Sequence, residues 1–307
     1  MYSISIILPV YNGIDYLEQS VCSVFRQSFE NFELLIIDDC STDGSWEYLQ
    51  SLQDGRIKVF RNTKNMGLFY NLNFLIKNSQ SSLIKLWSQD DIMYPNCIKE
   101  VIAFHQLYPQ IGFSYTGSDY IDANGNNLLL NKTDETPTII SRDLHYRIAC
   151  ITGSIAGNIS NVTITKIALD KVGLFNEQMK ISGDFEMWVR ISEEYYIGFL
   201  KKPLIQLRNH KAQLSNKEDL FIYHLKEDVQ VFNYMFSYLT VEQKKQGMVI
   251  LRNQKLLFYY TLMLKAAFKG HTRLAADFLK YLSKFDNIFI LTWFFIKRRV
   301  FKTKPEF

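Results

Sequence analysis

The chain has 307 residues, 47% of them hydrophobic and 15% aromatic, which is enough for one large buried core or two smaller ones. The formal net charge of +4 is small, so the composition gives no support for nucleic acid as a partner. The cysteines at positions 22, 40, 97 and 150 lie far apart, which argues against a zinc site or a disulfide framework and favours a reducing, cytoplasmic setting.

The first hundred residues alternate between short apolar runs and helical patterns. Ile4–Val10 is a β-rich run that ends near Pro9, because proline has no N–H to donate to a sheet. Three later runs predict strands at 32–37, 57–60 and 83–87, with helices that end at about 25, 52 and 76. This alternation predicts a mostly parallel sheet with helices on both faces.

Two of these strands end on adjacent carboxylates. Asp38 and Asp39 follow the second strand, and Asp90 and Asp91 follow the fourth. Adjacent ionised aspartates repel each other, so folding tolerates such a pair best where water or a cation compensates the charge. A solvated turn with Asp91 as a helix cap is the alternative. Because ligands bind outside the carboxyl ends of strands in such sheets, we expect Tyr11 and both pairs around one crevice.

The middle of the chain is less regular. Its patterns predict a helix at about 96–107, a strand at 111–115, a polar turn at 122–127, a loop at 131–138, a helix start at 141–144 and a strand at 158–164. Asp184 opens a further helix whose Met187, Trp188 and Ile191 would point inward, which leaves the carboxylate at the helix N-terminus. A simple N-cap is the alternative role for Asp184.

The last part of the chain changes to long helical patterns, at about 220–238, 241–268 and 272–285. The apolar stretch Ile288–Ile296 follows, and a cluster of Lys and Arg comes after it. The stretch is shorter than the ~18 to 20 residues that a membrane-spanning helix needs, and the chain does not begin like a signal peptide. Two readings stay open: an interfacial anchor on an anionic membrane, or a helix packed on the rest of the chain or on a second subunit.

Four motifs in a fixed order carry a resemblance to a known family. They are Ile7–Asn12, Ile36–Gly44, Asn65–Gly67 and Ser88–Asp91 with Pro95. Together they resemble glycosyltransferase family 2 enzymes of the GT-A fold over about residues 1–215. The resemblance implies an α/β, Rossmann-like fold: a mostly parallel central sheet flanked by helices, with a C-terminal helical extension. It also implies a catalytic domain at 1–215, with a nucleotide-binding half at 1–110 and an acceptor half at 111–215, and a helical region at 216–307.

The same resemblance implies an activity. The chain would be a metal-dependent, inverting glycosyltransferase that moves a sugar from a nucleotide diphosphate sugar, a UDP-sugar being favoured, to an acceptor hydroxyl in polysaccharide or glycan biosynthesis. The acceptor would be a glycan or a lipid-linked glycan. The helical region would contact the cytoplasmic face of a membrane or form a homo-oligomer. Two alternatives remain: a nucleotidyltransferase on a similar domain, and a nucleotide-sugar-binding protein that has lost catalysis.

Site residues follow from the matched motifs. The nucleotide-binding positions are Pro9, Val10, Tyr11, Asn12, Asp39, Asn65, Gly67 and Asp90. By resemblance, Tyr11 would pack on the base, Asp39 would accept the base N–H, and Asp90 would contact ribose or sugar. Asp91 would hold Mn²⁺ or Mg²⁺, with His210 as a further metal ligand, and the cation would act as a Lewis acid on the leaving diphosphate.

The catalytic base implied by the resemblance is Asp184, preceded by the family-like pattern Gly173–Glu177. It would accept the proton of the acceptor hydroxyl in a single displacement, so no covalent intermediate is expected. The chain departs from the family at three positions: Ser88 and Gly183 stand where many members have an acid, and Leu72 stands where an arginine is frequent. These departures are the reason for the alternative hypothesis of a nucleotide-sugar-binding protein that has lost catalysis.

Overall fold

The computed structural model describes residues 3–129, 135–210 and 220–301, which divide into two compact units. The first unit takes the described residues within Met1–Arg142, Ala156–Lys180 and Arg190–Gln213, and the second takes those within Asp143–Ile155, Ile181–Val189 and Leu214–Phe307. The two units therefore interleave along the sequence. The predicted division of the chain at 215/216 stays a prediction.

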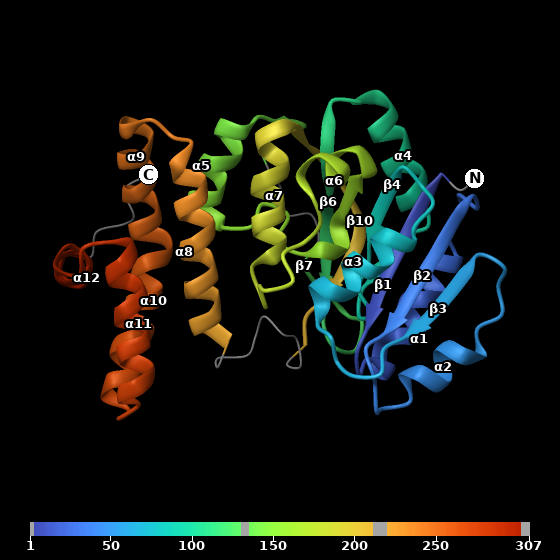
Figure 1. Ribbon diagram of the computed structural model, residues 1–307, viewed down its shortest axis with the longest axis horizontal. Helices are drawn as coiled ribbons and strands as arrows, with labels where there is room; N and C mark the ends of the chain where they lie inside the picture. Colours follow the sequence, from blue (N-terminus) through green and yellow to red (C-terminus); the bar gives the residue numbers. More distant parts are fainter. Residues whose placement is uncertain (1–2, 130–134, 211–219, 302–307) are drawn as a thin grey trace. The chain divides into compact units, whose positions relative to one another are not determined.

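A single mixed sheet organises the first unit (Figure 1). Its strands are β1 (Ile4–Val10), β2 (Phe32–Asp38), β3 (Ile57–Arg61), β4 (Leu83–Leu86), β5 (Ile92–Met93), β6 (Ile111–Ile121), β7 (Asn127–Leu129), β8 (Ile139–Ile140), β9 (Val162–Thr165) and β10 (Tyr196–Arg208). The order along the sheet is β3-β2-β1-β4-β9-β6-β10-β5, with β7 on β6 and β8 on β10.

Strands β1 to β4 are mutually parallel, and β9 is antiparallel to both β4 and β6. Because β10 is parallel to β6, it runs in the same direction as β1, β2 and β4. The carboxyl ends of these strands therefore lie at one edge of the sheet. The predicted fold class, a mostly parallel α/β sheet flanked by helices with a helical C-terminal region, is confirmed.

Helices cover both faces of the sheet. They are α1 (Ile14–Phe25), α2 (Ser45–Ser51), α3 (Leu68–Asn78), α4 (Cys97–Leu107) and α6 (Lys166–Val172). Buried side chains of α1 and α4 share one core with the side chains of β1 at positions 4, 6 and 8. Since neighbouring side chains of a strand point to opposite faces, Ile7 lies on the other face, where α3 contacts β1 and β2.

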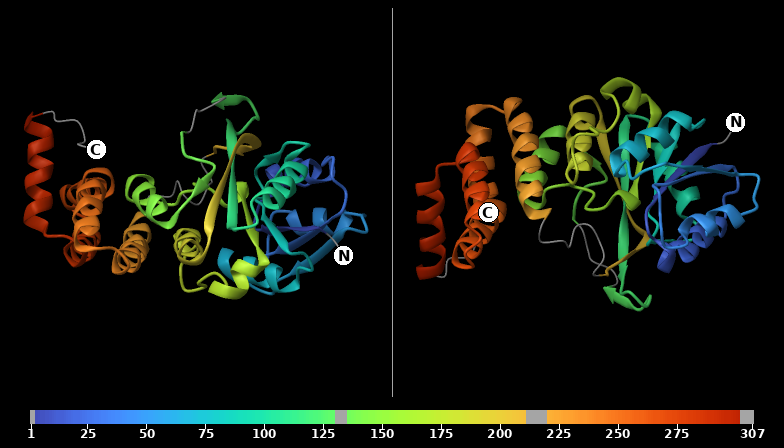
Figure 2. Two further views of the ribbon diagram at one scale, coloured as in Figure 1. Left: turned by 90° about the horizontal axis from the view of Figure 1, so that it is seen from above. Right: turned by 60° about the horizontal axis from the view of Figure 1, so that its bottom comes forward.

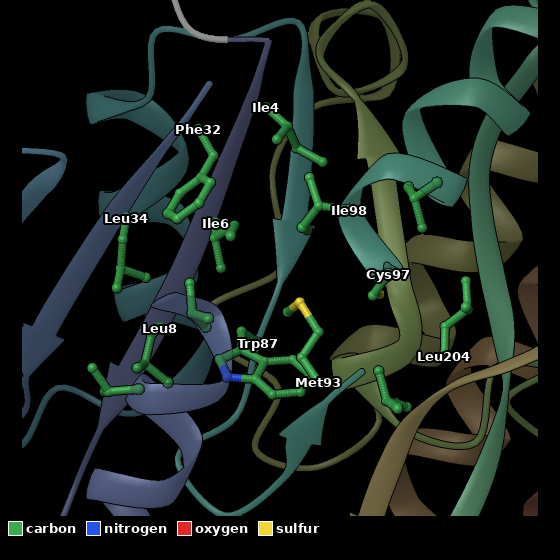
Figure 3. Packing of buried hydrophobic residues seen from close by; sticks show 14 of the residues in the cluster. Ile4, Ile6, Leu8, Phe32, Leu34, Trp87, Met93, Cys97, Ile98 and Leu204 are labelled. Atoms are coloured by element: carbon green, nitrogen blue, oxygen red, sulfur yellow. The ribbon is translucent and has the colours of Figure 1, made fainter. Parts of the chain in front are cut away.

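Trp87, directly after β4, is fully buried at the centre of this core. Figure 3 shows its indole between Leu8 of β1 and Met93 of β5. The indole Nε1 donates to Ser20 Oγ at 2.8 Å, and Ser20 Oγ donates to the carbonyl of Ser88 at 2.7 Å. A buried aromatic whose polar atom has a partner is a rigid anchor. It fixes the start of the acidic segment that follows.

Two predictions for the middle of the chain can be compared with the structure. The polar turn at 122–127 is confirmed between β6 and β7. The strand predicted at 158–164 begins only at Val162, because Ile159–Asn161 forms a 3₁₀ turn in which the Asn158 side chain accepts from the Ser160 N–H. Part of the loop predicted at 131–138 lies outside the described residues.

The second unit is helical. Its helices are α5 (Arg142–Thr152), the first half of α7 (Gly183–Glu194), α8 (Phe221–Ser237), α9 (Val241–Leu251), α10 (Leu257–Phe268), α11 (Thr272–Phe285) and α12 (Ile288–Phe301). The helix predicted at 241–268 is interrupted by a π-type turn at Arg252–Leu256. Helix α11 packs against α8, α10 and α12 (Figure 2). Across the described residues, every helix is too short or too polar to cross a membrane.

Candidate functional site

Hydrogen bonds connect the loops at the carboxyl ends of β1, β2 and β4. The Asp39 N–H donates to the carbonyl of Val10 at 2.8 Å, and the Asn12 N–H donates to Ser41 Oγ at 3.0 Å. The Tyr11 N–H donates to Gln89 Oε1 at 2.8 Å. The structure thus brings these three sequence motifs to one edge of the sheet, as expected for parallel strands.

Gln89 closes the loop that carries Tyr11. Its amide oxygen accepts from the Tyr11 N–H, and its amide nitrogen donates to the Tyr11 carbonyl at 3.1 Å. The same amide lies against Gly13, where an added Cβ would stand 2.3 Å from Gln89 Cδ. The backbone is thereby fixed while the Tyr11 side chain stays 48% exposed. Gln89 lies within the Ser88–Asp91 motif, but sequence reasoning assigned it no role, because a side-chain amide that bonds to a backbone has no distinctive pattern.

Two residues in the same loops have strained backbone conformations. Asn12 and Cys40 are, among the described residues, the non-glycine positions with positive φ, at +47° and +63°. Asn12 is held there by its side-chain oxygen, which accepts from the Thr42 N–H at 2.8 Å. Such conformations cost of order 1 kcal/mol and persist where surrounding contacts enforce them, as at ligand-binding sites.

The first acidic pair is directed into the protein. Asp38 is fully buried, and its carboxylate forms an ion pair with Arg61 Nε at 3.2 Å. Asp39, 3% exposed, accepts from Asn62 Nδ2 at 2.8 Å, from the Met66 N–H at 2.7 Å and from the Gly67 N–H at 2.9 Å. A carboxylate has roughly four lone-pair sites, so one remains for a base N–H.

These contacts shape the loop that contains the predicted residues Asn65 and Gly67. Gly67 has φ +89°, a conformation that glycine adopts without a side-chain clash. Asn65 is exposed beside it. Asp39 therefore has an evident role in holding this loop. Its role toward a base stays a prediction, as do those of Asn65 and Gly67.

Leu72, which stands where the family often has an arginine, belongs to the hydrophobic core. Leu72 is fully buried, so this position packs in the core. The next residue, Asn73, donates from Nδ2 to the Phe175 carbonyl at 2.9 Å and to Glu177 Oε1 at 2.8 Å, and its Oδ1 accepts from the Phe175 N–H at 2.9 Å. Phe175 also stacks on Phe69, with ring centroids 5.7 Å apart. Asn73 thus joins the Gly173–Glu177 pattern to the nucleotide half.

The second acidic pair divides into an accessible and a buried carboxylate. The Asp90 side chain is 17% exposed, and its Oδ2 lies 3.0 Å from His210 Nε2, whose side chain is 12% exposed. Its other oxygen accepts from the hydroxyl of Ser88. The imidazole also packs against the Tyr16 ring, with centroids 4.9 Å apart. The structure therefore pairs Asp90 with the predicted metal ligand His210.

Asp91 is directed inward. It is 1% exposed, its Oδ2 accepts from Ser160 Oγ at 2.5 Å, and its Oδ1 accepts from the Arg208 N–H at 2.9 Å. Burial, with a further contribution from the neighbouring Asp90 charge, raises the pKa of Asp91 to about 7. Burial also lowers the pKa of the nearby Lys85 to about 8. Each Asp91 oxygen accepts from one protein donor, and the metal role of Asp91 stays a prediction.

Arg208 ties the end of β10 to the acidic segment. Its Nε donates to the Asp90 carbonyl at 2.9 Å, its Nη2 donates to Gln19 Oε1 at 2.8 Å, and its guanidinium lies 4.5 Å from the centre of the Tyr16 ring. Arg208 is only 2% exposed, so its guanidinium is buried among these protein partners. Arg208 therefore holds the backbone at Asp90.

The donor set at Asp90 suits a divalent cation. A carboxylate oxygen and an imidazole nitrogen converge at 3.0 Å, and both are ligands that Mn²⁺ accepts. Among the described residues no group of three or more His, Cys, Asp or Glu could hold a metal. A cation here would take its remaining ligands from diphosphate and water, as Mg²⁺-type sites on phosphate substrates commonly do. The residues present fit such an ion.

Asp184 belongs to the second unit. It stands in the first turn of α7, where its Oδ2 accepts from Ser154 Oγ at 3.0 Å. Burial, with a smaller contribution from the Asp228 charge, raises the pKa of Asp184 to about 6. A carboxyl group with such a pKa is suited to proton transfer near neutral pH. Its role as the base stays a prediction.

Comparisons with known proteins identify the family. The model of glycosyl transferase family 2 matches residues 5–159. An uncharacterized glycosyltransferase of Rickettsia conorii is 32% identical over 216 residues, which cover 70% of this chain and 35% of the relative. The chain thus spans about a third of that relative's length. TuaG of Bacillus subtilis, which bears the name of a teichuronic acid biosynthesis glycosyltransferase, is 32% identical over 127 residues, covering 41% of this chain and 50% of TuaG.

Solved structures agree on the fold. TarS of S. aureus (residues 1–349) in complex with UDP-GlcNAc has a TM-score of 0.70 at 18% identity, covering 91% of this chain and 81% of that one. The mannosyltransferase PcManGT of Pyrobaculum calidifontis, in complex with GDP-Man and Mn²⁺, has a TM-score of 0.57 at 13% identity, covering 99% and 89%. The fold is that of GT-A enzymes, and the chain belongs to glycosyl transferase family 2.

Proposed function

We propose that this member of glycosyl transferase family 2 moves a sugar from a UDP-sugar to an acceptor hydroxyl during polysaccharide or glycan biosynthesis. The observation that carries the proposal is the edge of the sheet where an exposed Tyr11, the Asp39-supported loop and the Asp90–His210 pair come together. The TarS relative of this fold binds UDP-GlcNAc, so that sugar nucleotide is the first donor to test.

Each part of a nucleotide sugar has a counterpart at this edge. The exposed ring of Tyr11 offers a flat surface for the base, and the remaining lone pair of Asp39 offers an acceptor for a base N–H. Pro9, Val10 and Asn12 set the backbone of this loop, and Asn65 and Gly67 lie on the facing loop. We assign the donor nucleotide to these residues.

We place the divalent cation, Mn²⁺ or Mg²⁺, at Asp90 and His210 rather than at Asp91. Asp90 is the member of the pair that reaches solvent, and its Oδ2 lies 3.0 Å from His210 Nε2. When bound, a cation neutralises charge on the leaving nucleoside diphosphate. Asp91 instead supports Ser160 and the backbone at Arg208.

Asp184 is proposed as the general base. Its carboxylate would take the proton of the acceptor hydroxyl while that oxygen bonds to the anomeric carbon and the bond to the diphosphate oxygen breaks. One displacement of this kind inverts the anomeric configuration. The raised pKa of about 6 keeps Asp184 ionised at neutral pH and basic enough to accept a proton.

The test of this function is release of UDP from UDP-GlcNAc and other nucleotide sugars, with and without Mn²⁺, in the presence of glycan acceptors. Metal-stimulated release that requires an acceptor is the expected result, and NMR of the product should show an inverted anomeric centre. Donor binding without turnover for every sugar and acceptor would contradict the proposal and support a protein that has lost catalysis.

The helical region is proposed to contact the cytoplasmic face of a membrane. Phe289, Trp293 and Ile296 of α12 are 81%, 57% and 52% exposed, and their spacing puts them on one face. Arg298 and Arg299 lie in the last turn of the helix, and an exposed apolar stripe beside basic residues suits an anionic surface. A lipid-linked acceptor would be presented at such a surface. Self-association through the same stripe would give a homo-oligomer instead, which sedimentation without lipid would reveal.

A further inference from the structure

Helix α8 of the second unit carries two adjacent buried carboxylates that no sequence motif includes. Glu227 is 5% exposed and Asp228 is 6% exposed. Burying a carboxylate is costly unless hydrogen bonds or a counter-charge compensate it. The contacts of these two side chains therefore show what they support.

Glu227 and Asp228 both hold the segment that starts α7. Glu227 Oε2 accepts from the Ile181 N–H at 3.0 Å and from the Ser182 N–H at 2.9 Å. Asp228 Oδ1 accepts from Ser182 Oγ at 2.8 Å. These groups precede the first residue of α7, Gly183, and a negative charge near a helix N-terminus is favourable. Ser182 lies two residues before Asp184, so these bonds fix the turn from which Asp184 projects.

The other oxygen of Asp228 is fixed from the opposite side. Its Oδ2 accepts from Lys255 Nζ at 3.1 Å and from the Tyr259 hydroxyl at 3.2 Å. The Lys255 ammonium lies 5.8 Å from the ring centre of Phe185, the residue after Asp184. One carboxylate thus links the π-type turn of the helical region to the start of α7.

We propose that Glu227 and Asp228 are positioning residues for glycosyl transfer: through Ser182 they hold the start of α7 so that the Asp184 carboxylate is directed toward the acceptor hydroxyl. The inference rests on the proposed role of Asp184. It gives the helical region, which follows the segment matched by the family model, a part in the reaction.

The test compares Glu227→Gln and Asp228→Asn with Glu242→Gln, a matched change at an exposed acid of α9. We expect kcat to fall roughly 10- to 100-fold for the first two, since small misplacements of a reacting group cost up to about 10²-fold. KM for the donor and affinity for UDP with Mn²⁺ should change less than about twofold, and Glu242→Gln should match the wild type.

The pH profile separates positioning from general support of the fold. The Asp228 charge acts on Asp184, and Asp228 is itself paired with Lys255 of the π-type turn, while Glu227 accepts from the N–H groups of Ile181 and Ser182. Because the Asp228 charge raises the pKa of Asp184, Asp228→Asn should move the acid limb of kcat to lower pH. A purely structural role would reduce the amount of active enzyme and leave the limb where it is.

Ser182→Ala keeps the proposal testable if Asp228→Asn fails to fold, because it removes only the hydroxyl that Asp228 holds. Wild-type kcat and an unmoved acid limb in folded Glu227→Gln, Asp228→Asn or Ser182→Ala, with Asp184→Asn inactive, would overturn the positioning role and leave the proposed function intact. Full activity in Asp184→Asn would instead overturn the proposed base.

Discussion

Asp90→Ala and Asp91→Ala are expected to fail in different ways, although the two residues are adjacent. Asp90 is partly exposed beside His210, while Asp91 is buried with both oxygens engaged. Loss of Asp90 should remove the dependence of UDP binding on Mn²⁺. Loss of Asp91 should chiefly lower the free energy of unfolding.

The size of each effect follows from the contacts. Asp91→Ala leaves the Ser160 hydroxyl and the Arg208 N–H buried without their acceptor, at about 1 to 3 kcal/mol each, partly offset because a buried charge is removed. We therefore expect a net loss of about 2 to 4 kcal/mol. Asp90→Ala should lose less than about 1 kcal/mol of stability, as for a partly solvated pair. Its affinity for UDP in Mn²⁺ should fall at least about tenfold, equivalent to about 1.4 kcal/mol.

Urea unfolding followed by tryptophan fluorescence measures the first quantity, and calorimetric titration of UDP with and without Mn²⁺ measures the second. Asp91→Asn is the matched control, since it keeps one acceptor and should lose less stability than the alanine variant. Wild-type stability in Asp91→Ala together with loss of the Mn²⁺ effect would refute this reasoning and return the metal to Asp91.

The remaining predictions concern the proposed base Asp184, the hydrogen bonds of Gln89 to the Tyr11 backbone, and the helical region. Activity should fall below about pH 6, where Asp184 takes up a proton, and Asp184→Asn should reduce kcat at least about 100-fold with unchanged UDP affinity; a pH-independent rate between 5 and 8 would contradict this. Gln89→Ala should weaken UDP binding roughly three- to tenfold in titrations because the Tyr11 backbone loses two hydrogen bonds, whereas wild-type affinity would show that these bonds do not support nucleotide binding. Phe289→Ser with Trp293→Ser should lower binding to anionic vesicles in co-sedimentation, and undiminished binding would return α12 to a protein contact.

The stability of wild type relative to Asp91→Asn should also depend on pH. The pKa of Asp91 in the folded protein is about 7, above the value of 3.8 expected for the unfolded chain. Between these two pH values the folded state keeps a proton on Asp91 that the unfolded chain has released. The advantage of the wild-type residue should therefore be full below about pH 4 and decline as pH rises through about 7. An advantage that grows with pH would contradict the buried setting of Asp91. Urea unfolding at several pH values provides the measurement.

The sequence predicted which segments meet, because the carboxyl ends of parallel strands share an edge. Asp39 and Asp90 could be placed there on that ground alone. It did not predict which carboxylate of the pair Asp90 and Asp91 faces solvent. That depends on partners far along the chain, because Ser160 and the Arg208 N–H donate to the buried Asp91.

Long-range polar contacts explain most of what remained unpredicted. The alternating pattern at 158–164 did not reveal that a capped turn precedes β9 or that β9 is antiparallel to its neighbours. Glu227 and Asp228 sit in an amphipathic helix with no local signal of burial, and their partners at Ile181 and Ser182 are more than forty residues away. Hydrophobic periodicity reports which face is buried but not which buried acid holds which N–H group.

The most direct test of the central claim is the position of Mn²⁺ in crystals grown with UDP and Mn²⁺. Anomalous scattering should show the ion bound by the Asp90 carboxylate and His210 Nε2, with the UDP base against Tyr11. An ion held by Asp91, or UDP bound with no ion at Asp90, would contradict the proposed donor site.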